Sequence, residues 1–466
     1  MAGATYGQSI PLSAIAFGFG LNGPTRQSLS GGSCFARRRE WLRWMPHQAL
    51  DPGVHLIMTA NTRQAQNLNW TGRRFKQRTP WPIFLIVMMA AAGVHVKLGI
   101  CQAQDKLPAE SQQDSWKQIA SYFSPPAEWK NEFGDYRSPL RFTDGSVVQT
   151  PREWQRRRAE ISKEWQELLG AWPPLITEPK VEVLGSERRE NFEQLKIRFK
   201  WTPREFTTGY LLVPDGDGKR PAILTVYYEP ETAVGLQGEH RDFAYQLAKR
   251  GFVALSIGTT EATDAKTYAL YHPDIDNAEV EPLSMLGCAA ANSWHVLASR
   301  PEVDPKRIGV VGHSFGGKWA MFAGCLFDRF AAVAVSDPGI MLDTHPSVNY
   351  WEPWYLGWHP RPWRKRGVVT EENPACGLYP RLLEQSRDLH ELHALLAPRP
   401  VLVSGGAVDP PERWRALNHL VAINKLLGYE NRVGMTNRPK HSPNPESNAV
   451  IYAFFEHFLC GRSNDH

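Results

Sequence analysis

The chain has 466 residues, of which 42% are hydrophobic and 22% charged. This composition is typical of a folded protein with room for one large domain and additions, or for about two or three ordinary domains. The formal charge is +5, but residues 1–104 hold eleven Lys and Arg against Glu40 and Asp51, which leaves the remainder at −4. A mildly acidic body offers no basic face, so the sequence gives no support to nucleic-acid binding.

The basic excess near the N-terminus has the pattern of an export signal. Four Lys and Arg between 73 and 78 precede the apolar run 81–94, and small residues follow at Cys101 and Ala103. A run of this length is shorter than a bilayer span, and the order of charge, apolar run and small residues is typical of a signal peptide. We predict a periplasmic or secreted protein, cleaved near Ala103 and without a stable membrane span. An uncleaved anchor and a lipid-modified Cys101 are the alternatives.

The remaining chain divides by composition. Residues 1–57, rich in Gly, Ser and Arg and without periodicity, are interpreted as disordered or as lying upstream of a start at Met58, with the targeting segment over 58–104. Residues 105–180, with a helical stretch at 153–161, form a lead-in segment that packs on a larger body. We expect residues 181–462 to form the main domain, with an insertion at 337–387.

Short apolar runs alternate with helical patterns from about 193 onward, which predicts an α/β fold with a mostly parallel sheet. The predicted strands are 193–201, 208–213, 222–228, 252–257, 308–311, 331–335, 400–404 and 432–436. The predicted helices are 240–250, 282–299, 315–327, 388–396, 412–427 and 446–459. The insertion comes after the sixth of these strands.

The sequence Gly-His-Ser-Phe-Gly at 312–316 has the pattern G-x-S-x-G. It ends one predicted strand and opens the next helix, the setting of a nucleophile elbow, in which a tight turn exposes the serine hydroxyl. Helix N-H groups point to the same place and suit a developing oxyanion. We therefore predict Ser314 as the nucleophile. The alternative is a non-catalytic serine in a structural glycine turn, which would have the same sequence pattern.

A serine nucleophile needs a base, and at such an elbow the acid and then the histidine follow in chain order. Asp409 follows the strand 400–404, and His441 lies between the last strand and the last helix. We predict His441 as general base and acid and Asp409 as its partner. Asp337, at the end of the preceding strand, is a rival acid, and Glu412 is a weaker one.

The other histidines are interpreted as structural. His313 is expected to pack at the elbow, and His390, His393 and His419, all on predicted helices, are interpreted as surface or satisfied polar residues. The backbone N-H of Phe315 is the first predicted oxyanion donor. The second is expected from Tyr228 or Glu229, after the strand 222–228.

The insertion holds four Trp, two Tyr and four Lys or Arg within residues 349–366. Aromatic faces stack on sugars, so Trp351 and Trp354 are candidate substrate-binding residues in a cap wall. Packing of these rings onto the body is an equal alternative. The four cysteines after the signal segment, Cys288, Cys325, Cys376 and Cys460, allow three disulfide pairings and the sequence chooses none.

The region 303–317, from Val303 to Gly317, resembles the elbow of dienelactone hydrolases, acetyl xylan esterases and prolyl oligopeptidase relatives in the α/β-hydrolase superfamily. The stretches 388–403 and 153–158 are similar to glucuronoyl esterases. That resemblance implies an arginine after the nucleophile and a sugar-contacting lysine shortly afterwards. Lys318 matches the lysine, whereas Phe315 stands in place of the arginine and His313 in place of a cysteine that is common there.

Together these patterns predict an exported serine hydrolase that cleaves carboxylic esters, carbohydrate-linked acetyl or glucuronoyl esters in particular, on small-molecule or polysaccharide substrates. No cofactor and no metal site is expected, since neither C-x-x-C nor H-E-x-x-H spacing occurs. A prolyl oligopeptidase-type peptidase is the enzymatic alternative, although the lead-in is too short for its usual propeller domain. A non-catalytic binding protein on a hydrolase scaffold is the other.

Overall fold

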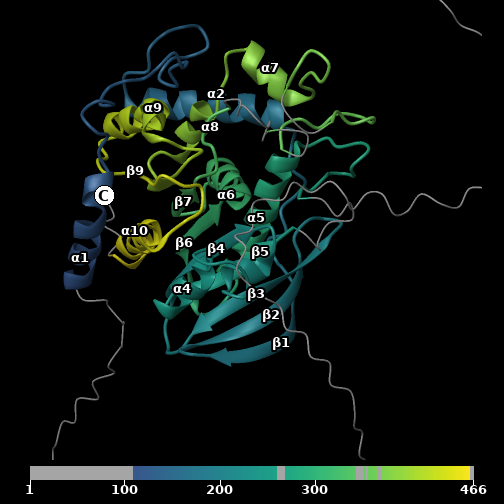
Figure 1. Ribbon diagram of the computed structural model, residues 1–466, viewed down its shortest axis with the longest axis vertical. Helices are drawn as coiled ribbons and strands as arrows, with labels where there is room; N and C mark the ends of the chain where they lie inside the picture. Colours follow the sequence, from purple (N-terminus) through teal and green to yellow (C-terminus); the bar gives the residue numbers. More distant parts are fainter. Residues whose placement is uncertain (1–108, 260–267, 343–350, 352–354, 366–368, 462–466) are drawn as a thin grey trace, which may run out of the picture. The chain divides into compact units, whose positions relative to one another are not determined.

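The structure is a computed structural model that describes residues 109–259, 268–342, 351, 355–365 and 369–461 (Figure 1). The predicted segments 1–57 and 58–104 lie outside these residues. Within the described part of the chain, no helix is both long and apolar enough to cross a membrane.

The described strands form one sheet of nine, in the order β1-β2-β3-β5-β4-β6-β7-β8-β9. Their bounds are β1 (Val181–Arg189), β2 (Phe192–Lys200), β3 (Phe206–Pro214), β4 (Arg220–Tyr227), β5 (Val253–Gly258), β6 (Val303–His313), β7 (Ala332–Ser336), β8 (Val401–Gly405) and β9 (Val433–Asn437). The pairs from β1 to β3, and β3 with β5, are antiparallel, and the others are parallel. The predicted mostly parallel α/β sheet is confirmed.

Helices lie before and between the strands. Their bounds are α1 (Ala109–Ile119), η2 (Ala120–Tyr122), α2 (Pro151–Leu169), α3 (Pro230–Ala233), α4 (Phe243–Lys249), α5 (Pro282–Ala298), α6 (Phe315–Leu326), α7 (Leu378–Glu384), α8 (His390–His393), η3 (Ala394–Leu396), η4 (Pro411–Arg413), α9 (Trp414–Leu426), α10 (Pro445–Phe455) and η5 (Glu456–Cys460).

Each of the eight predicted strands is present, and β1 is a ninth that the sequence pattern missed. All seven residues between its two ends are exposed, so the strand lacks the alternation of buried and exposed residues that marks a half-buried strand. Because of β1, the insertion 337–387 follows the seventh strand rather than the sixth. Of that insertion, 337–342, 351, 355–365 and 369–387 are described, and α7 lies in it.

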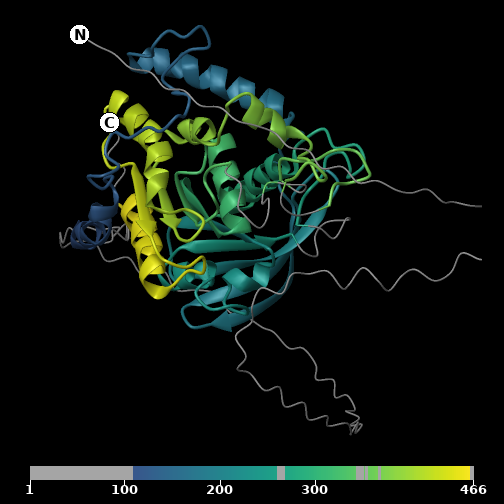
Figure 2. The same ribbon diagram turned by 45° about the horizontal axis from the view of Figure 1, so that its top comes forward.

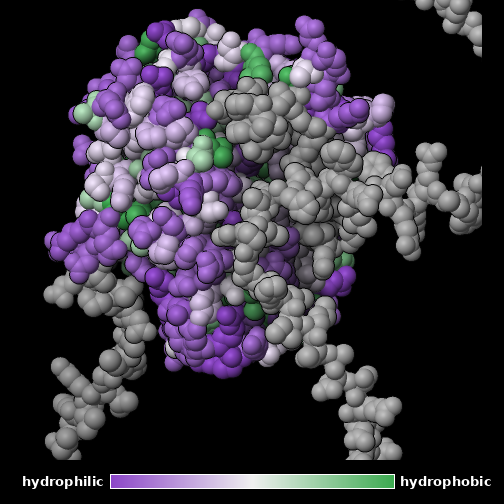
Figure 3. Space-filling view, viewed as in Figure 1, coloured by the Kyte–Doolittle hydropathy of each residue, from purple (hydrophilic) through white to green (hydrophobic). Residues whose placement is uncertain are grey.

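Alternate side chains of the central strands enter two different cores, because successive side chains of a strand point to opposite faces. Val333 and Val335 of β7 join the larger core with α2, α5, α6, α8 and α9, whereas Ala332 and Ala334 join the core with α1, α4 and α10. Figure 2 shows helices on both sides of the sheet. The coloured surface seen in Figure 3 is predominantly hydrophilic, as expected when the apolar residues fill these cores.

The lead-in segment, residues 105–180, contacts later parts of the chain at several points. Trp154 and Trp165 on α2 are buried in the larger core. Arg158 donates to the carbonyl of Leu395 at 2.9 Å and pairs with Asp328 at 2.6 Å. The indole N-H of Trp172 donates to Ser284 on α5 at 2.9 Å.

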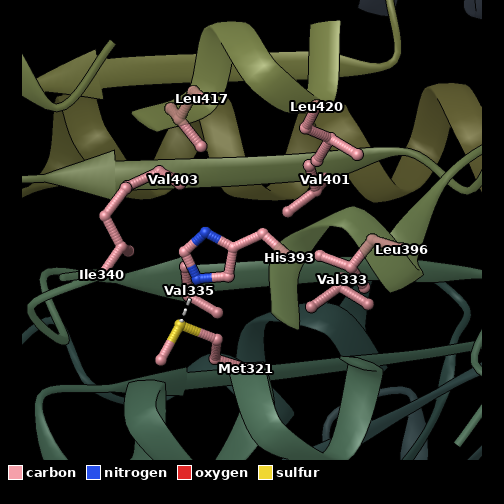
Figure 4. Close-up of a pocket in the computed structure, with 10 residues that line it drawn as sticks. All are labelled: Met321, Val333, Val335, Ile340, His393, Leu396, Val401, Val403, Leu417 and Leu420. Carbon is pink, nitrogen blue, oxygen red and sulfur yellow. Dashed lines mark hydrogen bonds between the residues drawn. The ribbon is translucent and has the colours of Figure 1, made fainter. Parts of the chain in front are cut away.

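A pocket lies between α6, α8, α9 and the strands β7 and β8 (Figure 4). His393 is the one polar side chain among its ten lining residues, and its Nε2 lies 3.0 Å from the sulfur of Met321. Burial lowers the pKa of His393, and that of His390, to about 3. His390, His393 and His419 are all buried, so the expectation of surface positions is wrong. The alternative of a satisfied polar residue suits His419, whose Nε2 contacts the carbonyl of Phe133. His390 contacts the carbonyl of Arg137 through Nε2, but its buried Nδ1 has no hydrogen-bond partner.

Candidate functional site

The turn from β6 into α6 places Ser314 at the end of the strand. Ser314 has φ +56° and ψ −116°, a backbone conformation that L-residues rarely adopt. A side chain at Gly312 would collide with the carbonyl of Gly316, and one at Gly316 would collide with the carbonyl of Val226 on β4. The two glycines thus permit the close packing that a nucleophile elbow requires.

Three side chains meet at this turn. The Ser314 hydroxyl lies 2.9 Å from Nε2 of His441, and Nδ1 of His441 lies 2.7 Å from Oδ2 of Asp337. Asp337 follows β7 and is fully buried, whereas the side chain of His441 is 35% exposed. Since Asp337 has no donor when ionised, His441 donates from Nδ1 and is left with Nε2 as the acceptor for the serine proton.

The prediction of Asp409 as the partner of His441 is wrong in this structure. The two carboxylate oxygens of Asp409 accept from the backbone N-H groups of Gly339 and Ile340, at 2.8 and 2.7 Å. The backbone N-H of Asp409 donates to Asp337 at 2.8 Å. Asp409 therefore holds the turn that follows Asp337, and the rival acid weighed from the sequence occupies the site. Glu412, in η4, is exposed.

The two neighbouring carboxyl groups differ in electrostatic environment. Burial first, and then the charge of Asp337, raise the pKa of Asp409 to about 6, against the opposing effect of its hydrogen bonds from Ile340 and Gly339. Such a shift makes the ionised form costly. The guanidinium of Arg413, whose Nε lies 3.6 Å from Oδ1 of Asp409, also opposes the shift. Asp337 has the imidazole of His441 as its partner.

Tyr228 and Phe315, the predicted oxyanion residues, lie together beside Ser314. Their rings stack with centroids 4.7 Å apart. The Tyr228 hydroxyl shares a hydrogen bond with the Ser314 side chain, and burial raises the pKa of this tyrosine well above its ordinary value. The phenol thus stays protonated and able to donate. The sequence predicts only the backbone N-H of Tyr228 as a donor. The signal for its side chain is the place of this tyrosine, at the end of a strand beside the elbow.

Lys318 and Trp351 contact each other. The ammonium of Lys318 lies 3.8 Å from the centroid of the Trp351 ring and donates to the carbonyl of Pro338. Both side chains are buried, at 5% and 2% exposure. In this arrangement they support the turn after Asp337 rather than present a sugar-binding face. Trp354, the other predicted aromatic contact, lies outside the described residues.

His313 has the contacts expected of a packing residue at the elbow. Its Nδ1 lies 3.0 Å from the carbonyl of Ser336, which also accepts from the backbone N-H of Ser314 at 2.8 Å. Burial lowers the pKa of His313 well below its ordinary value, and the nearby charge of His441 acts in the same direction. His313 is therefore neutral.

Cys288 and Cys325 are buried free thiols.

The sequence is similar to those of several known proteins. The Dienelactone hydrolase family matches residues 207–347. A 4-O-methyl-glucuronoyl methylesterase of Neurospora crassa is 24% identical over 326 residues, covering 64% of this chain and 74% of that protein. A protein of the same name from Thermothelomyces thermophilus is 23% identical over 366 residues, covering 70% of this chain and 81% of that protein.

Solved structures share the fold. A glucuronoyl esterase from Solibacter usitatus superimposes with a TM-score of 0.55 at 15% identity, covering 69% of this chain and 97% of its own. A promiscuous esterase of carbohydrate esterase family 15, from a marine bacterial metagenome, gives a TM-score of 0.54 at 16% identity, with 70% and 97% covered. The sheet and its flanking helices thus have the α/β-hydrolase architecture.

Proposed function

We propose that this chain, an α/β-hydrolase and a carboxylic ester hydrolase, cleaves carbohydrate-linked esters through an acyl-enzyme on Ser314, with glucuronoyl esters as its first substrate class. The observation that carries the proposal is the unbroken series from Ser314 through His441 to Asp337, at 2.9 and 2.7 Å. The names of the two methylesterase relatives supply the substrate class.

The proposed reaction has two halves, the acylation of Ser314 and the hydrolysis of the acyl-enzyme. Ser314, His441 and Asp337 take part in both. His441 Nε2 takes the Ser314 proton as Oγ attacks the ester carbonyl carbon, and then gives that proton to the departing alcohol. Water repeats the sequence on the acyl-enzyme, which releases the carboxylic acid and restores Ser314. Asp337 keeps the Nδ1-H tautomer in place and stabilises the imidazolium.

The negative oxygen of the tetrahedral intermediate needs donors. We assign this role to the backbone N-H of Phe315, at the N-terminus of α6, and to Tyr228. Because the Tyr228 hydroxyl already lies at Ser314, it can donate to the oxyanion once the serine proton has moved to His441. We propose that this donor serves in place of the arginine that the glucuronoyl esterase resemblance implies after the nucleophile, where this chain has Phe315.

Acetyl esters are the second candidate class. The lysine matched to a sugar contact, Lys318, is engaged by Trp351 and Pro338. The side of the elbow formed by Phe315 is aromatic, with Tyr228, Tyr268 and Tyr355 within 6.1 Å between ring centroids. Phe315 and Tyr355 are buried, whereas Tyr228 and Tyr268 are partly exposed, so these two rings can contact an uncharged acyl group.

A substrate panel tests the proposal. Protein beginning at Gln104 is assayed on a methyl glucuronate ester, an acetylated sugar, a feruloyl ester and a prolyl peptide, beside Ser314→Ala. We expect the highest kcat/KM on the glucuronate ester. Highest activity on the acetylated sugar would replace the substrate class and keep the mechanism, whereas cleavage of the peptide alone would favour the peptidase alternative. Activity on none would overturn the catalytic proposal.

Tyr228→Phe tests the assignment of the oxyanion donor. The substitution keeps the ring stacked on Phe315 and removes only the hydroxyl, so we expect kcat to fall about 10²-fold, the usual cost of one such donor, with KM within about two-fold of wild type. Tyr245→Phe is the matched control, because that hydroxyl contacts Glu190. If both variants keep wild-type kcat, Tyr228 is not a donor to the oxyanion.

Export is a further part of the proposal. The charged and apolar pattern over 58–104 supports cleavage after Ala103. The intact mass of protein recovered from the periplasm or the medium checks this directly. A mass that retains residues before Gln104 would contradict it.

A further inference from the structure

Arg438 is a buried arginine three residues before His441. It follows β9 directly, and only 5% of the residue is exposed. An arginine is seldom buried unless its charge and its five N-H groups have partners. The identity of those partners therefore indicates what the side chain does.

The guanidinium donates in three directions. Nη2 donates to the carbonyl of His441 at 2.6 Å and to the hydroxyl of Ser336 at 3.2 Å. Nε donates to the carbonyl of Ser442 at 2.9 Å. Nη1 donates to the carbonyl of Ser404 at 2.8 Å, and its other contacts are the Ser404 hydroxyl and the carbonyl of Gly405. These contacts account for all five N-H groups.

The acceptors share one property, which is that each lies beside a member of the site. Ser336 directly precedes Asp337, and its carbonyl accepts from the backbone N-H of Ser314. The carbonyl of Ser404 accepts from the backbone N-H of Asp337 at 3.0 Å. The remaining acceptors are His441 itself, the residue after it, and Gly405 at the end of β8. One planar group thus joins the ends of β7 and β8 to the histidine loop, which is the segment 438–444 between β9 and α10 that carries His441.

We infer that Arg438 is a positioning residue, which fixes the backbone of the histidine loop so that the His441 ring spans Ser314 and Asp337. This inference rests on the proposed function, since it assigns a task within that site. The side chain touches neither the serine nor the reacting atoms, so its effect passes through His441.

Lysine at 438 is the informative substitution. It keeps the positive charge but has a single ammonium with three donors, which cannot reproduce a planar fork. Catalysis is sensitive to displacements of about 1 Å, for which losses near 10² are typical. We expect Arg438→Lys to lower kcat about 10- to 100-fold while KM stays within about two-fold of wild type.

Arg399→Lys is the matched control. Arg399 is also largely buried and donates to backbone carbonyls, those of Phe327, Phe330 and Leu395, but none of these acceptors adjoins the site. Both variants are compared by thermal melting and by kcat. Comparable losses of stability, with a loss of kcat only in Arg438→Lys, support positioning. Wild-type kcat in a folded Arg438→Lys overturns it, as does a rise of KM alone.

Two readouts separate positioning from a general structural effect. In a His441→Ala background, Arg438→Lys should change the residual rate less than two-fold, and an undiminished loss there would contradict action through His441. The proton NMR signal of His441 Nδ1-H should be present in the wild type and weakened or shifted in Arg438→Lys but not in Arg399→Lys. This signal needs no substrate, so it tests the inference even where the ester panel fails. An unchanged signal overturns it.

Discussion

Alanine in place of Ser314 should lower kcat on the preferred ester about 10⁶-fold, the loss that serine hydrolases show when the nucleophile is removed. The Ser314 hydroxyl is the atom that lies 2.9 Å from His441 Nε2, at the turn from β6 into α6. Without it, no acyl-enzyme forms. The residual rate then comes from the oxyanion donors and substrate binding alone.

This result is checked by steady-state rates and by the mass of protein treated with an organophosphonate. Wild type should gain one adduct on Ser314 and lose activity in proportion. Ser186→Ala, on the exposed edge strand β1, is the matched control and should label and hydrolyse normally. An alanine variant at 314 that still turns over at the wild-type rate would show that another group is the nucleophile.

Asp337→Asn should have the second largest effect, a loss of kcat of about 10⁴. The amide keeps the shape of the carboxylate but can donate to Nδ1 of His441, which favours the tautomer that carries its proton on Nε2. That tautomer cannot accept the proton of Ser314. The negative charge that stabilises the imidazolium is also lost.

Asp409→Asn is the internal comparison for that variant. Its amide oxygen can still accept from Gly339 or Ile340, so the turn after Asp337 loses one charge-assisted hydrogen bond rather than its acceptor. Losing such a bond loosens the turn that follows Asp337, and the small displacement of Asp337 and His441 that results should lower kcat about 10-fold, far less than the loss in Asp337→Asn. If Asp409→Asn proves the more damaging of the two, the pairing of His441 with Asp337 does not describe the working enzyme.

Sequence patterns predict most of this fold because the central strands are short, apolar and separated by helical segments. They fail at β1, where the side chains meet water on both faces and no periodic signal results. The helices α1, α3 and α7 were also missed. Two of these are only four and seven residues long, too short for a helical period to be recognised.

Some residues of the site could likewise be predicted from the sequence, and others could not. Ser314 and His441 could be predicted because the elbow has a sequence pattern and the chain order of the histidine is fixed by the fold. The choice between Asp337 and Asp409 could not be predicted, because each acid follows one of two adjacent parallel strands, β7 and β8. Only the position of the His441 ring distinguishes them. The same holds for Lys318, whose burial against Trp351 depends on how the chain returns after β7.

The contact of Gly316 with Val226 has a consequence for how this enzyme can be altered. Val226 pairs with Gly312 across β4 and β6, and Tyr228 follows two residues later, so the nucleophile and its neighbouring phenol are carried on one hydrogen-bonded ladder. Any substitution that widens the space between these strands would move both groups at once. Selection for new substrates should therefore accumulate changes away from this ladder, and the spacing of β4 and β6 should be the part of the protein least tolerant of redesign.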